Sequence, residues 1–105
     1  MRLKDKVVVV TGSTSGIGEA IARRSVAEGA RVLVHGLETD LGEAVAGSLG
    51  EAAALHVDDL ADPEAVTRIV EAALSAFGRI DALVNNAARV QRSTIETTDA
   101  ALFDK

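Results

Sequence analysis

Hydrophobic positions gather in short runs that alternate with segments of helical period along the chain. Four of these runs are too short for helices and are bounded by glycine or polar residues, so we expect them to be buried strands. They cover residues 6–11, 30–34, 52–57 and 81–84. The intervening segments predict helices over residues 16–28 and 40–49, and a third that is capped by Asp62, starts at Pro63 and stops at Gly78. Thr98 predicts the cap of a last helix over residues 99–105.

The spacing of apolar residues also predicts which side of each helix faces the core. For the first helix these residues are Ile17, Ala20 and Ile21. The second helix is weaker, because Gly42 and Gly47 each cost about 1 kcal/mol relative to Ala, although Asp40 and Glu43 could cap its start. The third follows the i, i+3, i+4, i+7 rule most clearly, through Val66, Ile69, Val70, Ala73, Leu74 and Phe77.

The order β-α-β-α-β-α-β predicts a parallel sheet with right-handed crossovers. We expect an α/β fold of the Rossmann type, a doubly wound sheet with strand order 3-2-1-4 and a switch point between the first and fourth strands. Residues 81–84 are apolar on both faces of the strand, as in a central strand, and nothing later in the chain can pair with them. We therefore expect residues 1–105 to be the N-terminal part of a larger domain. This part would contain the cofactor-binding strands and lack the catalytic half.

Composition narrows the function classes. Hydrophobic residues make up 48% of the 105 residues and aromatic residues only 2%, so aliphatic side chains must build the core. The net charge of −5 and the absence of a basic patch argue against a nucleic-acid or anionic-membrane partner. The chain has no cysteine, which fits a reducing, cytoplasmic setting. The start, MRLKDK, has no apolar signal region, and no run is long enough to span a membrane.

The loop TGSTSGIG joins the first predicted strand to the first helix, beside the switch point. Glycines allow the turn and let a ligand approach the backbone, hydroxyls add donors, and the helix start offers free N–H groups to a pyrophosphate. The residues expected to bind are Gly12, Ser13, Thr14, Ser15, Gly16, Ile17 and Gly18. The alternative is a tight turn that binds nothing. The spacing G-x-x-x-G-x-G is not that of a P-loop, and no lysine follows, which argues against a kinase or ATPase.

With this loop, two further stretches resemble the short-chain dehydrogenases/reductases. DDLADPEAV at residues 58–66 is similar to the family's D-[VL]-x-D stretch, and GRIDALVNNAA at residues 78–88 to its G-x-[IL]-D-x-L-V-N-N-A-G. The resemblance implies that Asp59 and Leu60 lie at the adenine and that Asn86, Ala87 and Ala88 lie near the cofactor ribose. Ala88 replaces the family's usual glycine, which affects the fine geometry of cofactor binding.

The end of the second strand is expected to select the cofactor, because an acid there accepts the ribose hydroxyls of NAD and an arginine accepts the NADP phosphate. By alignment these positions are Gly36 and Leu37, so neither signal is present, and Ser15 is not an arginine either. Nothing pairs with a phosphate, so the sequence favours NAD over NADP. Glu38 is a candidate substitute for the missing acid.

Other polar residues have competing interpretations. Asn85 and Asn86 could contact a ligand or tie neighbouring loops together, and Asp59 could serve the approach to the next helix instead of the adenine. His35 and His56 are interpreted as ordinary strand-end residues, because spacing suggests no partner for either. Two loop arginines, Arg89 and Arg92, fit solvated charges better than the mouth of a substrate site. The carboxylates lack metal-ligand spacing, so we expect no metal site.

The resemblance implies hydride transfer between a nicotinamide and an alcohol or carbonyl substrate, performed with a Ser, a Tyr-x-x-x-Lys pair and an Asn. The chain has no tyrosine, and its lysines are Lys4, Lys6 and Lys105, so no catalytic residue can be assigned in it and the chain alone is expected to be inactive. The sequence leaves open a non-catalytic dinucleotide-binding or regulatory module, and an interaction fragment that completes its sheet by dimerising. The family resemblance implies that the full-length form is a homo-oligomer; the substrate cannot be deduced.

Overall fold

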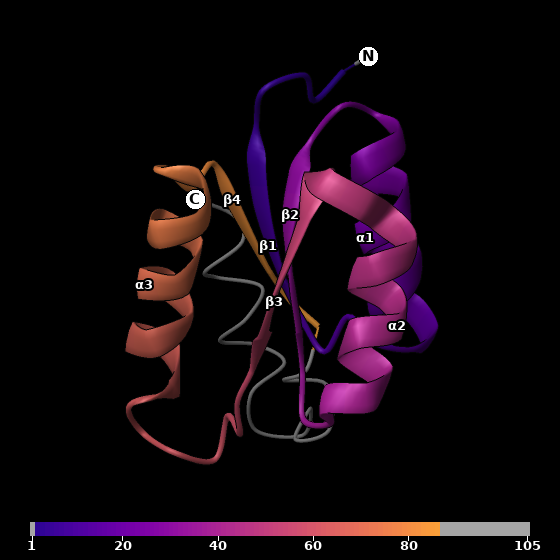
Figure 1. Ribbon diagram of the computed structural model, residues 1–105. Coiled ribbons are helices and arrows are strands. Elements are labelled where there is room, and N and C mark those ends of the chain that lie inside the picture. The colour runs from indigo at the N-terminus through magenta and orange to yellow at the C-terminus, as the bar shows by residue number, and fades with distance from the viewer. Residues whose placement is uncertain (1, 87–105) are drawn as a thin grey trace.

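The computed structural model describes residues 2–86, and these form one parallel sheet between two layers of helices (Figure 1). The expected last helix over residues 99–105 and its cap Thr98 lie outside the described residues. The elements follow in the order β1 (Val7–Thr11), α1 (Gly16–Ala27), β2 (Arg31–Gly36), α2 (Thr39–Leu49), a 3-10 turn η1 (Gly50–Ala52), β3 (Ala53–Val57), α3 (Ala65–Phe77) and β4 (Ala82–Asn85).

The strand order β3-β2-β1-β4 confirms the predicted doubly wound arrangement. All three strand pairs are parallel, and Val9 of β1 lies between Leu33 of β2 and Leu83 of β4. The order reverses beside β1, because α1 leads the chain to β2 on one side and α3 leads it to β4 on the other. The loop that follows β1 therefore opens onto the crevice where such sheets bind ligands.

The sheet separates two apolar cores. Helices α1 and α2 cover one face and α3 covers the other (Figure 1). Alternate residues of each strand enter each core, as the period of two demands: Val8, Val10, Val32 and Val34 pack toward α1 and α2, whereas Val9 and Leu33 pack toward Ile69 and Ala73 of α3. The valine run of β1 is at most 5% exposed, which confirms a buried central strand.

Helix α1 shows an expectation that was wrong. Its buried residues are Gly18, Ala22 and Ser25, while Ile17 is 63% exposed and Ala20 is exposed. Only small side chains allow α1 to lie close to β1, so the narrow row of small residues faces the sheet, although Ile17 is more hydrophobic. Ile21 packs at the edge of the core, as expected. Shape therefore decided the rotation of this helix more than hydrophobicity did.

The starts of the other helices also differ from prediction. The N-cap of α2 is Glu38, whose side chain makes no capping bond, so the expected capping pair of Asp40 and Glu43 is absent. Helix α3 starts at Ala65 instead of Pro63. Asp62 accepts a hydrogen bond from Glu64 N at 2.9 Å through its Oδ1, and this turn occupies the residues before the helix.

Part of the apolar face of α3 is uncovered within residues 2–86. Val66 is 58% and Leu74 46% exposed, and Leu83 of the neighbouring β4 is 44% exposed, so their predicted inward orientation is only partly realised. Ala65, Ile69 and Ala73 form the buried row of this helix. In the described part of the chain β4 is an edge strand, and no helix there has the length and apolar character needed to cross a membrane.

Candidate dinucleotide site at the carboxyl edge of the sheet

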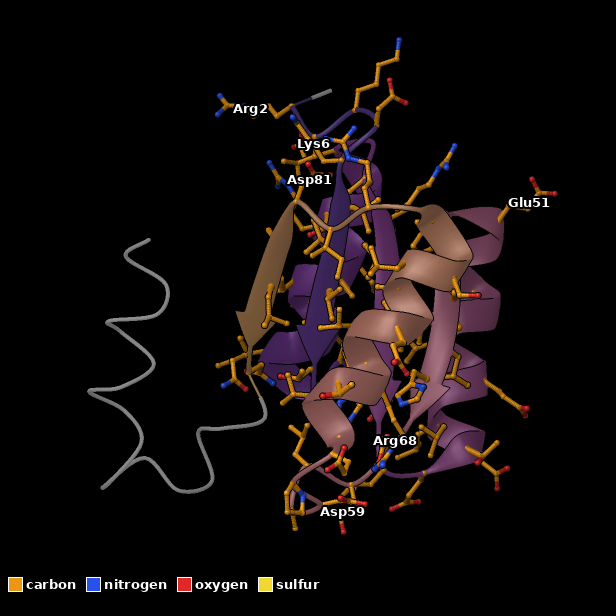
Figure 2. All side chains as sticks on the ribbon, turned by 90° about the vertical axis from the view of Figure 1, so that its left-hand side faces the viewer. Arg2, Lys6, Glu51, Asp59, Arg68 and Asp81 are labelled. Carbon is orange, nitrogen blue, oxygen red and sulfur yellow. The ribbon has the colours of Figure 1, made fainter. Side chains whose placement is uncertain are left out.

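A cavity of about 660 Å³ opens at the carboxyl ends of the strands. It is lined by the glycine loop, the end of β2, the turn after β3, one side of α3 and the end of β4. Figure 2 places Asp59 and Arg68 at this end of the molecule, whereas Arg2, Lys6 and Asp81 lie at the opposite end. The cavity therefore occupies the switch-point crevice that the strand order creates.

The glycine loop turns at two residues with left-handed backbone. Gly12 has φ +63° and Gly16 has φ +60°, a region that side chains with a Cβ rarely adopt. Ser15 caps α1 with extended backbone and makes no side-chain capping bond, so its hydroxyl and the first N–H groups of the helix stay available. Nothing lies within 4 Å of a Cβ built on Gly16. The start of α1 is thus open to an anion, which its dipole would favour.

Gly18 has a different reason to lack a side chain. A Cβ on Gly18 would collide with the carbonyl oxygen of Gly12 and would lie 2.7 Å from Nδ2 of Asn86. Asn86 Nδ2 donates a hydrogen bond of 3.0 Å to that same carbonyl. Gly18 is therefore a packing glycine, and its absence of a Cβ allows β4 and α1 to meet at the glycine loop.

Asn85, one residue before Asn86, connects β4 to β1. Thr11 pairs with Asn85 in the β1–β4 register, and Thr11 Oγ1 lies 3.1 Å from Asn85 Oδ1 and 3.3 Å from the carbonyl oxygen of Val84. Both asparagines line the cavity. Of the two interpretations raised by the sequence, tying neighbouring segments together is the one that these contacts show.

The end of β2 is shaped by Thr14. A Cβ on Gly36 would lie 2.5 Å from Thr14 Cγ2, so a larger residue at Gly36 would require the Thr14 side chain to move. Gly36 thus packs closely against the Thr14 side chain of the glycine loop. The next two residues, Leu37, which is 66% exposed, and Glu38, line the cavity together with Leu41 of α2. Glu38 is thus a carboxylate that lines the cavity just after the end of β2.

The turn after β3 is held by Asp58. Its carboxylate accepts hydrogen bonds from Arg68 Nε at 2.7 Å, from Arg68 Nη2 at 2.8 Å and from the backbone N–H of Asp59 at 2.9 Å, and it contacts His56 Nε2 at 2.8 Å. The bonds from Arg68, and then the contact with His56, hold the pKa of Asp58 far below its usual range. Asp58 is 10% exposed, so this paired carboxylate is part of the scaffold.

Asp59 lies next to Asp58 and is exposed at the cavity. Its Oδ1 accepts a hydrogen bond of 2.9 Å from the N–H of Ala61, which closes a tight turn. Asp59 therefore shapes the approach to α3, and it also presents its carboxylate to the cavity beside Leu60. The two interpretations of Asp59 are compatible in this geometry.

His35 makes a contact that sequence reasoning missed. The ring is 2% exposed; its Nδ1 lies 3.0 Å from the backbone N of Gly12 and its Nε2 lies 3.0 Å from the carbonyl oxygen of Asp58. Burial lowers the pKa of His35 below its ordinary value. A search for polar residues at strand ends finds His35, but no spacing signal could pair it with residues 23 positions away in both directions.

The structure brings eight of the residues expected from the sequence to one cavity: Gly12, Thr14, Ser15, Gly36, Leu37, Asp59, Leu60 and Asn86. Ser13 is fully buried instead, and its hydroxyl accepts a hydrogen bond from His35 N at 2.8 Å. The cavity lining does not include Gly16, Ile17 or Gly18. Ala87 and Ala88 lie outside the described residues, as do Arg89 and Arg92.

Comparisons with known proteins agree with this geometry. The profile of the short chain dehydrogenase family matches residues 6–105. Meso-2,3-butanediol dehydrogenase of Serratia marcescens is 44% identical over 93% of this chain and 40% of its own length. An NADP-dependent (R)-specific alcohol dehydrogenase of Lentilactobacillus kefiri is 39% identical over 92% of the chain and 39% of its own length.

Among solved structures, a 3-ketoacyl-(acyl-carrier-protein) reductase of Brucella melitensis in complex with NADH matches with a TM-score of 0.74 and 41% identity. The match covers 77% of this chain and 33% of the reductase. The chain thus spans about 40% of the length of its curated relatives. By a profile match over nearly its whole length, the chain belongs to the short chain dehydrogenase family.

Proposed function

We propose that this chain supplies the cofactor-binding part of an NAD-dependent oxidoreductase that interconverts an alcohol and a carbonyl compound. The nicotinamide dinucleotide supplies the hydride acceptor or donor in such a reaction. The observation that supports the proposal is the open glycine loop at the switch point, which faces acidic and apolar residues across one cavity. The residues of this chain bind and orient the cofactor, and catalytic groups belong to the rest of the protein.

The donors of the site suit a pyrophosphate. Ser15, Gly16 and the following N–H groups form the start of α1, where backbone donors and the helix dipole favour an anion. Thr14 stands between this loop and Gly36, with its methyl group against the β2 end. We therefore propose that the pyrophosphate cradle consists of Gly12, Thr14, Ser15, Gly16, Ile17 and Gly18, mainly through their backbone groups. Ser13 would support this loop through its hydrogen bonds to the His35 backbone.

The opposite part of the cavity suits an adenosine. Leu37, Leu41 and Leu60 supply apolar surface for the base, while Asp59 supplies an acceptor for its amino group. Glu38 is the carboxylate nearest the end of β2 in sequence that lines the cavity, so we assign it to the ribose hydroxyls. Asn86, Ala87 and Ala88 are proposed to lie on the nicotinamide side, where Asn86 fixes the loop carbonyl of Gly12.

The acidic lining favours NAD over NADP. A 2′-phosphate near Glu38 would meet a carboxylate, and neither Ser15 nor Leu37 offers a positive charge to offset it. The relatives named above include an NADH complex and an NADP-dependent enzyme, so the choice rests on these residues of the chain itself.

Fluorescence titration of the full-length protein with NADH and with NADPH tests the proposal. We expect NADH to bind at least tenfold more tightly, because an unpaired phosphate beside a carboxylate costs more than about 1.4 kcal/mol. Binding of neither cofactor at millimolar concentration would refute the site, and a preference for NADPH would refute the assignment of Glu38. A protein that binds NADH but transfers no hydride to or from a panel of secondary alcohols and ketones would contradict the oxidoreductase assignment.

A further inference from the structure

His35 occupies a position between two loops that border the cavity. It is the second last residue of β2, and its side chain lies on the same face of the sheet as Leu33, beneath the cavity. One ring nitrogen contacts the glycine loop at Gly12, and the other contacts the turn after β3 at Asp58. The ring thus links the loop proposed for the pyrophosphate to the turn proposed for the adenine, in addition to the bonds between Ser13 and the His35 backbone.

The two partners determine the protonation state of the ring. A backbone N–H can only donate, so Nδ1 of His35 must be the unprotonated acceptor for Gly12. A carbonyl oxygen can only accept, so Nε2 must carry the proton that it donates to Asp58. Only the neutral Nε2–H tautomer satisfies both bonds. Protonation of Nδ1 would place two donors against each other at 3.0 Å.

We propose that neutral His35 is a positioning residue for dinucleotide binding, which holds the glycine loop against the adenine-side turn and releases that loop when the imidazole is protonated. This inference rests on the proposed cofactor site. A positive charge near a pyrophosphate would by itself favour the anion, but Nδ1–H can be accommodated only if the N–H of Gly12 moves away. The predicted effect of acid is therefore weaker binding.

The surroundings keep His35 neutral near pH 7. Burial lowers its pKa, and His56, which pairs with it in the β2–β3 register, adds to this effect when charged. The hydrogen bond to the Asp58 carbonyl and, less strongly, the Asp58 carboxylate act in the opposite direction, and Arg68 of α3 pairs with that carboxylate. The glycine loop presents neutral hydroxyls at Ser13 and Thr14, and the carboxylates of Glu38 and Asp59 line the same cavity. Ser13 further locks the backbone of His35 through bonds at 2.8 and 3.3 Å.

Two substitutions separate the two bonds. His35→Asn keeps an acceptor near the position of Nδ1, whereas His35→Gln keeps a donor near the position of Nε2, and neither side chain titrates. His56→Gln is the matched control, because His56 lies on the neighbouring strand, also contacts Asp58, and makes no described contact with the glycine loop. Thermal unfolding at pH 8 checks that each variant is folded.

The experiment measures the dissociation constant of NADH for the full-length protein between pH 8 and pH 5. We expect the wild type and His56→Gln to lose about tenfold in affinity over this range, the scale of one broken buried hydrogen bond. His35→Asn should bind almost as tightly as the wild type at pH 8 and stay flat, and His35→Gln should be about tenfold weaker at every pH. A flat wild-type profile, a gain in affinity in acid, or a slope that disappears in His56→Gln instead would overturn the inference.

A nuclear magnetic resonance titration distinguishes this inference from the proposed function. Imidazole ¹⁵N shifts should report the Nε2–H tautomer of His35, and the amide of Gly12 should shift with the same midpoint as that ring, with or without cofactor. If no cofactor binds at pH 8, the proposed function fails. The shared titration midpoint of the His35 ring and the Gly12 amide still tests whether His35 holds the glycine loop. If the ring is the other tautomer, or if Gly12 does not follow its titration, the link itself is wrong.

Discussion

The side-chain amide of Asn86 donates a 3.0 Å hydrogen bond to the carbonyl oxygen of Gly12, and so the end of β4 holds the first turn of the glycine loop. The two residues are 74 positions apart in the chain. Parallel pairing of β1 and β4, with Thr11 opposite Asn85, brings them together. The shape of the proposed pyrophosphate cradle therefore depends on the last described strand.

Asn86→Ala is expected to weaken NADH binding about five- to tenfold, because a partly buried carbonyl loses its donor at a cost of about 1 kcal/mol or more. Asn86→Asp should weaken binding further, since its carboxylate faces the carbonyl of Gly12 and repels the pyrophosphate. Cofactor titration of the full-length protein gives both values. Equal affinity of the two variants and the wild type would show that the loop keeps its shape without this bond.

Gly18→Ala should disrupt the site and destabilise the fold. The new methyl group meets the backbone carbonyl of Gly12, which cannot move aside as a flexible side chain would. Overpacking of this kind costs about 1–3 kcal/mol. Urea unfolding and NADH titration of the same sample should show both losses. Retained affinity in Gly18→Ala would contradict the packing argument. Gly16→Ala tests a different effect, because a Cβ on Gly16 has free space but the φ of +60° disfavours alanine.

The two glycines of α2 should respond differently to alanine. Gly47 is exposed and nothing lies within 4 Å of its Cβ position, so Gly47→Ala should stabilise the protein by about 0.5–1 kcal/mol. Gly42 is buried, and its Cβ would lie 2.5 Å from Leu55 Cδ1, so Gly42→Ala should lose that gain by displacing Leu55. Urea unfolding of the pair measures the difference. A more stable Gly42→Ala than Gly47→Ala would show that the contact with Leu55 is not restrictive.

Asp58 should make the fold sensitive to acid. Its pKa is lowered in the folded state, chiefly by the bonds from Arg68, so its contribution is present above the unfolded pKa of about 4 and is lost as the pH falls below it. We expect the wild type to lose more unfolding free energy between pH 5 and pH 3 than Asp58→Asn, which should be less stable at pH 7. Asp62→Asn is the comparison: the bond from Glu64 N and then the bond from Arg68 also lower the pKa of Asp62, but Asp62 is 46% exposed, so this substitution should change the acid profile less than Asp58→Asn. Parallel acid profiles for wild type and Asp58→Asn would contradict the prediction.

Leu37→Arg should shift the cofactor preference toward NADP. Leu37 is 66% exposed at the rim of the cavity, so an arginine fits there without a loss of core packing. A guanidinium that pairs with the 2′-phosphate contributes about 1.5–3 kcal/mol, which corresponds to at least a tenfold gain for NADPH relative to NADH. Leu41→Arg is the comparison on α2, farther along the chain from the β2 end. An unchanged ratio in Leu37→Arg would place the ribose away from this rim.

The type of each described strand and α-helix was predictable from the sequence, because it follows from short-range patterns, and the strand order followed from the expected doubly wound arrangement. The run of valines after Lys6 can only be a buried strand, and strands separated by helices of this length must lie parallel. The glycine loop was predictable for a related reason: its position after the first strand, together with the strand order, places it at the switch point. Helix boundaries were less certain, and Asp62 shows why, since its side chain stabilises a turn as readily as a helix start.

The orientation of α1 and the links among the loops were decided only by the tertiary structure. Hydrophobic period favoured Ile17 facing inward, but the close approach of α1 to Gly12 and Asn86 admits only Gly18 there. Thr14 lies against Gly36, a contact between two strand ends that no local pattern encodes. Likewise His35 has its partners 23 residues away on either side. Sequence periodicity determines which elements form, whereas steric fit and hydrogen bonding between distant segments determine which side chains reach the cavity.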